Sequence, residues 1–235
     1  GKVDGQGGND TVLNGDAWTL GWDNATATAE SRGVAFKNIY SADGSEDVLT
    51  GSADADSFSL EGNTVIGNGI RFTVADGASK FKKVSAGDST LDELDAKGGT
   101  VTLTDIEKEV SFESIYFNGL DVIDGAIIQG SDSGETFALT GDNALTVKAI
   151  DFTSVSTVLG SDVASANRAT GGEGWTLIGG NAAQQVTSRG VTFTELNTAE
   201  GSLSVLTGSA SDDVFTLSDN AEKITANGIE FTLTN

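Results

Sequence analysis

An internal repeat constrains the fold of this chain more than any other feature of the sequence. Its first signature is an aromatic or aliphatic residue, one intervening residue and Leu. It occurs at Trp18-Thr-Leu20, Phe58-Ser-Leu60, Val101-Thr-Leu103, Phe137-Ala-Leu139, Trp175-Thr-Leu177 and Phe215-Thr-Leu217, at spacings of 36 to 43 residues. Self-similarity at a fixed period of this length is typical of solenoids, propellers and repeat arrays.

A second signature ending in Phe follows each copy of the first. Its six copies are Gly33-Val-Ala-Phe36, Gly69-Ile-Arg-Phe72, Glu109-Val-Ser-Phe112, Ala149-Ile-Asp-Phe152, Gly190-Val-Thr-Phe193 and Gly228-Ile-Glu-Phe231. Six units of about 40 residues therefore fill the chain. Because no linker separates them, we expect residues 1–235 to form a single continuous segment of a longer chain, without an internal boundary.

A longer register is superimposed on the short one. Ser31-Arg-Gly-Val-Ala-Phe36 returns as Ser188-Arg-Gly-Val-Thr-Phe193, and Val48-Leu-Thr-Gly-Ser-Ala53 returns as Val205-Leu-Thr-Gly-Ser-Ala210, both after 157 residues. Units one and two thus resemble units five and six more than their neighbours. This pattern indicates the duplication of a four-unit block.

The local pattern within each unit predicts β-strands. Segments such as Asn63-Thr-Val-Ile66 alternate apolar and polar residues, and Gly, Asn, Asp and Ser interrupt the strands at short intervals. Only residues 89–95 have a briefly helical pattern. Short strands in a fixed repeat favour an all-β fold, a parallel β-solenoid (β-helix) of six units with roughly two coils per unit. The absence of proline fits interior strands that use every N–H group.

An array of antiparallel β-hairpin repeats is the alternative architecture. Asn68-Gly69 and Asn227-Gly228 stand between alternating apolar runs, which is the strongest local hairpin signal. However, Leu145-Thr-Val-Lys-Ala-Ile-Asp-Phe152 has no such turn residues at the corresponding place. We therefore expect a bend between two strands of one coil in all six units, which favours the solenoid.

Composition excludes several classes of function. The chain has no Cys and no His, so it cannot form a Cys/His zinc site, a thiolate nucleophile or a Ser-His-Asp triad. Its formal net charge of -22 argues against nucleic acid or an anionic membrane as a partner. No apolar run is long enough for a membrane span. Cations are the natural counter-species of such a chain.

Acidic residues in glycine-rich turns are candidates for calcium binding, because calcium prefers closely spaced carboxylate and carbonyl oxygens. Asp10, Asp56 and Asp213 are the candidate metal ligands, and calcium is the only cofactor that the sequence suggests. Gly5-Gln-Gly-Gly-Asn-Asp-Thr-Val12 resembles one copy of the nonapeptide of calcium-binding RTX proteins, without tandem recurrence. Ordinary turn residues are the favoured interpretation of the same acids.

Residues that break the repeat are where a catalytic site would be expected. The acids Asp92, Glu93, Asp95, Glu107 and Glu109 depart from the pattern, and a carboxylate pair among them would suit a polysaccharide-degrading β-helix. A solvated surface charge run is the favoured interpretation, so we expect these acids to be scattered over the outer surface and the chain not to be an enzyme. Trp22 has no counterpart in unit five and is the best candidate for an exposed aromatic contact.

The motifs Val-Leu-Thr-Gly-Ser-Ala, Phe-Thr-Leu and Asn-Gly-Ile-x-Phe resemble the repeat regions of large secreted bacterial adhesins of the filamentous-haemagglutinin-like and biofilm-matrix types. The resemblance implies an extracellular or cell-surface location and a β-helical shaft that supports adhesion or biofilm cohesion. Its partners would be cell-surface or matrix polysaccharides or neighbouring cells. A surface-layer or fibre subunit that associates end to end is an alternative, because an uncapped coil edge is a template for further strands.

Overall fold

The computed structural model describes residues 1–75, 81–161, 166–180, 184–219 and 222–234, and these residues form β-strands, turns and loops without a helix. The predicted fold class, an all-β parallel β-solenoid, is confirmed. The chain forms two compact units. Unit 1 contains Gly1–Ala96 and Lys108–Ile123, and unit 2 contains Lys97–Glu107 and Asp124–Asn235. The prediction of a single segment without an internal boundary stays a prediction.

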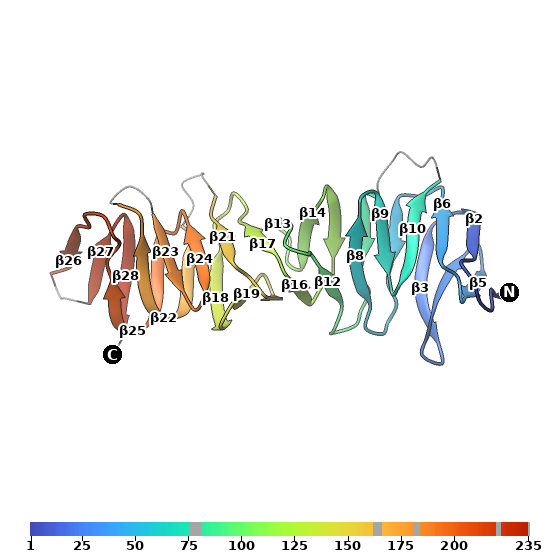
Figure 1. The fold of residues 1–235 in the computed structure, drawn as a ribbon, viewed down its shortest axis with the longest axis horizontal. Helices are drawn as coiled ribbons and strands as arrows, with labels where there is room; N and C mark the ends of the chain where they lie inside the picture. Colours follow the sequence, from blue (N-terminus) through green and yellow to red (C-terminus); the bar gives the residue numbers. More distant parts are fainter. Residues whose placement is uncertain (76–80, 162–165, 181–183, 220–221, 235) are drawn as a thin grey trace. The chain divides into compact units, whose positions relative to one another are not determined.

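Unit 1 contains fourteen complete strands among the described residues (Figure 1). They are β1 (Lys2–Asp4), β2 (Thr11–Gly15), β3 (Trp18–Asp23), β4 (Thr26–Ser31), β5 (Val34–Lys37), β6 (Ser41–Gly44), β7 (Val48–Thr50), β8 (Ser57–Glu61), β9 (Thr64–Gly67), β10 (Ile70–Val74), β11 (Lys83–Ser85), β12 (Glu93–Asp95), β14 (Glu109–Phe112) and β15 (Ile115–Asn118). Residues 89–95 do not form a helix, although their pattern is briefly helical, because Glu93–Asp95 form strand β12.

Unit 2 contains the remaining strands, and β16 (Val122–Asp124) runs from one unit into the other. They are β13 (Thr100–Leu103), β17 (Ile127–Gln129), β18 (Thr136–Gly141), β19 (Ala144–Val147), β20 (Ile150–Thr153), β21 (Thr157–Leu159), β22 (Arg168–Ile178), β23 (Gln185–Ser188), β24 (Val191–Thr194), β25 (Thr198–Thr207), β26 (Phe215–Leu217), β27 (Lys223–Ala226) and β28 (Ile229–Thr234).

Successive coils stack through parallel strand pairs. In unit 1, β7 pairs with β11 and β8 with β12, and in unit 2, β17 pairs with β21 and β22 with β25. Partners such as Thr100 and Ile127, or Ser57 and Glu93, are 27 and 36 residues apart. One coil is therefore longer than the half-repeat that the sequence pattern predicted, and the expectation of roughly two coils per unit is wrong.

The extra length of each coil lies in antiparallel meanders. The strands β3–β4–β5 and β8–β9–β10 of unit 1 pair antiparallel in sequence, as do β18–β19–β20, β22–β23–β24 and β26–β27–β28 of unit 2. The chain thus combines the predicted solenoid with the hairpins of the alternative. The expected bend within a coil is wrong, because the two strands at this point return on each other.

Two consecutive residues with positive φ make the last turn of each meander. Asn68 and Gly69 have φ of 51° and 81°, and Lys148 and Ala149 have φ of 49° and 58°. Positive φ at both central positions is the type I′ conformation, whose twist matches that of the two strands. The pair Lys148-Ala149 therefore forms the same hairpin as Asn-Gly without the usual turn residues.

In the third repeat, the sequence pattern assigns the second signature to the wrong strand of the hairpin. The turn with positive φ is Glu113-Ser114, so Phe117 in β15 occupies the position of the signature phenylalanines, and Phe112 lies one strand earlier. Tyr116 pairs with Lys83 as Ala35 pairs with Lys2, so Tyr116 is the repeat equivalent of Ala35. Both strands of this hairpin have an apolar residue, one polar residue and Phe, and the pattern alone does not distinguish them.

Most of the signature residues form the core of their unit, whereas Phe215 and Leu217 of the sixth repeat are exposed. Phe72, Phe152, Phe193 and Phe231 are fully buried, and Phe36 is half-buried. In unit 1 the Trp18 ring lies 5.9 Å from both Phe36 and Phe72, and in unit 2 the Trp175 ring lies 6.2 Å from both Phe193 and Phe231. The same ring cluster is therefore built twice: Trp18 and Phe36 recur after 157 residues, and Phe72 recurs after 159.

Glycine makes room for each tryptophan. A Cβ atom on Gly15 would lie 2.3 Å from the Trp18 ring, and a Cβ atom on Gly172 would lie 2.1 Å from the Trp175 ring. Such distances exclude any side chain at either position. The two glycines are thus required by the packing of the tryptophan rings.

Candidate functional site

A glycine-serine turn closed by an acid recurs before the first signature of the even-numbered repeats. In unit 1, Asp56 accepts hydrogen bonds from the Ser52 amide at 2.5 Å, the Ser52 hydroxyl at 3.1 Å and the Asn68 side-chain amide at 2.5 Å. In unit 2, Asp213 accepts the same bonds from Ser209 and Asn227, at 2.6 to 3.1 Å. Both carboxylates thus hold their own turn against the hairpin that follows.

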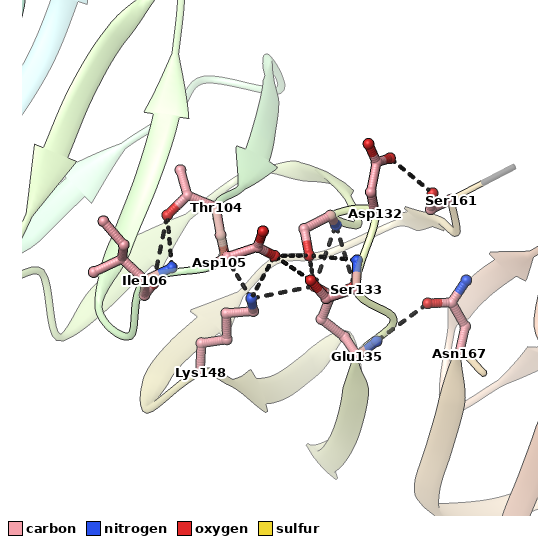
Figure 2. A network of polar contacts seen from close by, with 10 residues as sticks. Thr104, Asp105, Ile106, Asp132, Ser133, Glu135, Lys148, Ser161 and Asn167 are labelled. Carbon is pink, nitrogen blue, oxygen red and sulfur yellow. Dashed lines mark hydrogen bonds and ion pairs between the residues drawn. The ribbon is translucent and has the colours of Figure 1, made fainter. Parts of the chain in front are cut away.

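The fourth repeat contains a longer version of this site, in which Glu135 replaces the aspartate and Lys148 the asparagine (Figure 2). The Glu135 carboxylate is almost fully buried. It accepts hydrogen bonds from the Ser131 amide and hydroxyl, and Lys148 Nζ lies 3.3 Å from Glu135 Oε1. The longer acid and the longer cation occupy the positions of an aspartate and an asparagine, so the two substitutions compensate each other.

Asp105 extends this network on the outer side. Its carboxylate accepts hydrogen bonds from the hydroxyls of Ser131 at 3.0 Å and Ser133 at 2.5 Å, and Lys148 donates to the Thr104 carbonyl at 2.5 Å (Figure 2). The bonds from Ser133 and Ser131 hold the pKa of Asp105 below its ordinary value. Stabilisation of ionised Asp105 by these hydroxyls links the loop after β13 to the turn before β18.

A second polar ladder joins the residues that precede the parallel strands. The Asp56 amide donates to the Asp92 carboxylate at 2.9 Å, and the Asp92 amide donates to Asp121 at 3.1 Å. In unit 2 the Glu135 amide donates to Asn167 at 3.2 Å, and the Asn167 amide donates to Asn197 at 2.8 Å. Each of these side-chain oxygens thus accepts a hydrogen bond from a backbone N–H group of the preceding coil.

The Asp92 carboxyl has a strongly raised pKa. Burial raises its pKa to about 6, and the neighbouring carboxylates of Asp56 and Asp121 add to this rise, while the Asp56 amide and Lys108 oppose it. A perturbed pKa in a cleft often marks a catalytic acid. However, the Asp92 side chain is fully buried, so a substrate has no access to it.

The three predicted calcium ligands lie in different settings. Asp56 is buried, Asp213 is half-buried and bonded in the same way, and Asp10 is half-buried before β2, with its Oδ2 atom unpartnered among the described residues. The described part of the chain contains no group of three acidic side chains placed to hold a metal ion. Calcium binding at Asp10, Asp56 and Asp213 therefore stays a prediction.

The acids that depart from the sequence pattern do not all lie on the surface. Glu93 and Glu107 are exposed and Asp95 is half-buried, whereas Asp92 and Glu109 are buried. The expectation of five scattered surface acids is thus wrong for these two. Asp92 belongs to the repeat after all, because its carbonyl accepts two amides of the next coil just as that of Asn167 does. One-residue shifts between repeats hide this equivalence in the sequence.

A depression of about 530 Å³ lies over the first strands of unit 1, beside the predicted exposed aromatic. Trp22 is 40% exposed, as expected. Charged side chains surround it: Lys37 lies 3.2 Å from Asp4 and 3.8 Å from Asp23. An aromatic ring with neighbouring donors and acceptors is an arrangement that can bind a polar ligand with an apolar face.

A scan against protein-family models and searches of curated proteins and of solved structures found no match to this chain. Among the described residues, no helix is long and apolar enough to cross a membrane.

Proposed function

We propose that this chain is a non-enzymatic structural shaft from a secreted bacterial adhesin or an extracellular, biofilm-matrix filament. Its task would be mechanical. Backbone ladders between coils carry load along the stack, and the acidic surface, with a net charge of -22, discourages lateral collapse onto other copies.

The observation that supports a structural role best is the use of the repeated acids. The carboxylates of Asp56, Glu135 and Asp213 accept hydrogen bonds from donors of their own turn and hairpin. One carboxylate oxygen of Asp92 accepts a hydrogen bond from the Asp56 amide of the preceding coil, and the Asp92 side chain is buried. Groups engaged in this way stabilise coils and are not available to activate water or to protonate a leaving group.

An activity screen tests the absence of catalysis. Incubation with acidic and neutral polysaccharides, followed by assays for new reducing ends and unsaturated products, should give no signal above that of heat-denatured protein. Cleavage that disappears in Glu93→Gln or Glu107→Gln would overturn the shaft and establish the alternative, a β-helical polysaccharide-degrading enzyme. These two variants alter exposed acids, so loss of folding is not a competing explanation.

For a shaft with weak adhesive contacts, the partner we propose is a cell-surface or matrix polysaccharide that reaches neighbouring cells. The depression around Trp22 supports this partner, because sugar rings present an apolar face that stacks on an exposed aromatic. Binding to immobilised matrix polysaccharide should weaken in Trp22→Ala and persist in Tyr116→Ala, which removes a more exposed aromatic elsewhere in unit 1. Equal binding of both variants would contradict the proposal that the depression around Trp22 binds polysaccharide.

A further inference from the structure

Two equivalent grooves lie over stacked parallel strands, one groove in each unit. The unit 1 groove has a volume of about 560 Å³ and crosses strands β3, β7, β11 and β15. The unit 2 groove has a volume of about 500 Å³ and crosses strands β13, β17, β21 and β24. Four hydrogen-bonded strands therefore form the floor of each groove.

The floor of each groove is a row of paired residues that point away from the core. The row is Thr19, Thr50, Ser85 and Asn118 in unit 1, and Thr102, Gln129, Leu159 and Thr194 in unit 2. The residue before each of them is buried, so alternation along the strand directs the row outward. Thr19 and Thr102 are the middle residues of two first signatures, so the two rows occupy the same place in the repeat.

Glycines of the stacked turns line one side of each groove. They are Gly51 and Gly87 in unit 1, and Gly130 and Gly160 in unit 2. A Cβ atom on Gly51 would lie 1.8 Å from the Ala86 carbonyl oxygen, and a Cβ atom on Gly160 would lie 2.8 Å from a carbonyl oxygen of the next coil. Close stacking of the turns thus excludes side chains at both positions, and backbone forms this part of the wall.

In unit 1 the strands that border the groove are paired on both sides. Strand β3 lies between β4 and β7, and β15 lies between β14 and β11. In unit 2, β24 likewise lies between β21 and β23. The grooves are therefore internal features of the coil stack. Their floors are fixed by backbone ladders before a ligand binds, which reduces the entropy lost on binding.

The floor of the unit 1 groove offers hydrogen-bonding groups that the fold does not use. Thr19 and Thr50 are exposed, and Ser85 and Asn118 are half-buried. These four side chains make no hydrogen bond within the part of the chain that the structure describes. Hydroxyl groups and carboxamides both donate and accept hydrogen bonds, as the hydroxyl groups of a sugar do. The row is thus chemically matched to a polyhydroxylated ligand.

Charge determines which polyhydroxylated ligands fit. The described residues that line the two grooves include no Lys and no Arg. Asp88 lines the unit 1 groove, and Asp132, which accepts a hydrogen bond from Ser161 at 3.1 Å (Figure 2), lines the unit 2 groove together with Glu195. These acids and the net charge of -22 repel anionic sugars and nucleic acids, but not a neutral glycan.

We infer that each groove binds a linear neutral polysaccharide whose chain crosses the four strands. Neighbouring strands lie about 4.8 Å apart, so each row spans about 14 Å. Successive sugars of an extended glycan are separated by a similar distance, so one sugar lies over each strand and meets one side chain of the row. The inference rests on the proposed polysaccharide partner, but its sites are separate from the depression around Trp22.

Calorimetric titration of the 235-residue chain carrying Trp22→Ala tests the inference. The probes are linear glucan, mannan and galactan oligosaccharides, with oligogalacturonate of the same length as the anionic match. At least one neutral probe should bind at two sites per chain, and oligogalacturonate should bind at least tenfold more weakly. A chain that binds none of the neutral probes, or that prefers oligogalacturonate, would overturn the inference.

Two strands of unit 2 provide a matched control, because each carries two outward threonines. In Thr100-Val-Thr102 and Thr192-Phe-Thr194, only the second threonine lines the groove. Thr102→Val/Thr194→Val should weaken binding at one of the two sites at least tenfold, whereas Thr100→Val/Thr192→Val should leave both sites unchanged. Valine suits an outward strand position, so both double variants should fold. Equal effects of the two double variants would contradict the assignment of the groove.

The Trp22→Ala variant also separates this inference from the proposed function. Binding that is present in the unaltered chain and absent from Trp22→Ala would overturn the inference and leave the proposed partner in place. Binding that is the same in both chains and weakens in Thr102→Val/Thr194→Val would support the grooves and contradict the proposed role of the depression.

Discussion

At the scale of single residues, stability depends on side chains that the repeat places at the same internal position. Phe152 is one of them: it lies in β20 and is almost fully buried within unit 2. Because the core is closely packed, the neighbouring side chains cannot move far enough to fill the cavity that truncation of Phe152 would leave.

Phe152→Ala should therefore reduce the free energy of unfolding by about 3 to 5 kcal/mol. Urea denaturation measures the loss, and Tyr116→Ala, which truncates an exposed aromatic, is the control. A loss below about 1 kcal/mol at Phe152 would mean that this residue is not part of the core.

The buried carboxyl of Asp92 makes stability depend on pH. Its folded-state pKa of about 6 exceeds its ordinary value of 3.8, so the folded chain binds this proton more tightly than the unfolded chain. The stability that protonated Asp92 contributes is complete below pH 3.8 and is lost as the pH rises through 6. Asn167 shows that a neutral amide fits the equivalent position in unit 2.

Asp92→Asn should therefore stabilise the chain at neutral pH, by up to about 3 kcal/mol. The difference between the variant and the unaltered chain should be small near pH 4 and should grow up to pH 7. Denaturation curves across this range measure it. A variant that is equally or less stable at pH 7, or a difference independent of pH, would contradict the raised pKa.

At the scale of elements, the hairpin of each even-numbered repeat is tied to its glycine-serine turn by a matched pair. The pair is aspartate with asparagine in repeats two and six, and Glu135 with Lys148 in repeat four. Removing one member of a buried ion pair is costly, because the other charge is left buried without compensation.

Lys148→Asn alone should reduce the free energy of unfolding by about 3 kcal/mol. The double variant Glu135→Asp/Lys148→Asn recreates the pair of Asp56 with Asn68 and should recover more than half of that loss. Lys82→Asn, which removes a cation from an exposed ion pair, should cost less than about 1 kcal/mol. Additive effects of the two substitutions in a double-mutant cycle would show that the residues are not coupled.

The sequence predicted the strands and the solenoid because alternation and the fixed repeat are local properties. It did not predict how the strands pair, because parallel and antiparallel neighbours impose the same alternation on a strand. Lys148-Ala149 illustrates the difficulty: it forms the same positive-φ turn as Asn68-Gly69 without a residue that favours it. Packing of Leu145 and Phe152 in the core stabilises the hairpin where the turn itself does not.

The candidate site was only partly predictable for a related reason. The acids Asp56 and Asp213 were visible as members of a repeat, but their donors lie up to 14 residues away in a different turn. Asp92 resembles an irregular surface acid in the sequence, because the loops before it differ in length between repeats. Its burial follows from stacking on β8, a contact between residues 36 positions apart.

At the scale of the whole molecule, the excess of acidic residues sets the response to cations. The net charge is -22, and the candidate ligands Asp10, Asp56 and Asp213 are repeated without standing in tandem. Millimolar calcium added to chelator-treated protein should therefore raise the melting temperature only slightly, through charge neutralisation or weak sites. Magnesium at equal ionic strength is the control. Complete unfolding in chelator would contradict this prediction and show that calcium is integral to the fold.

The central claim is that the repeated acids are structural acceptors that hold each turn against the hairpin that follows it. Asp54 and Asp56 test it most directly, because they stand two residues apart in one turn and only Asp56 is buried. Urea denaturation at neutral pH should show a loss of about 2 to 4 kcal/mol for Asp56→Ala, which leaves the Ser52 and Asn68 donors unsatisfied. Asp54→Ala should change the free energy of unfolding by less than about 0.5 kcal/mol. Equal and small effects of the two substitutions would contradict the claim.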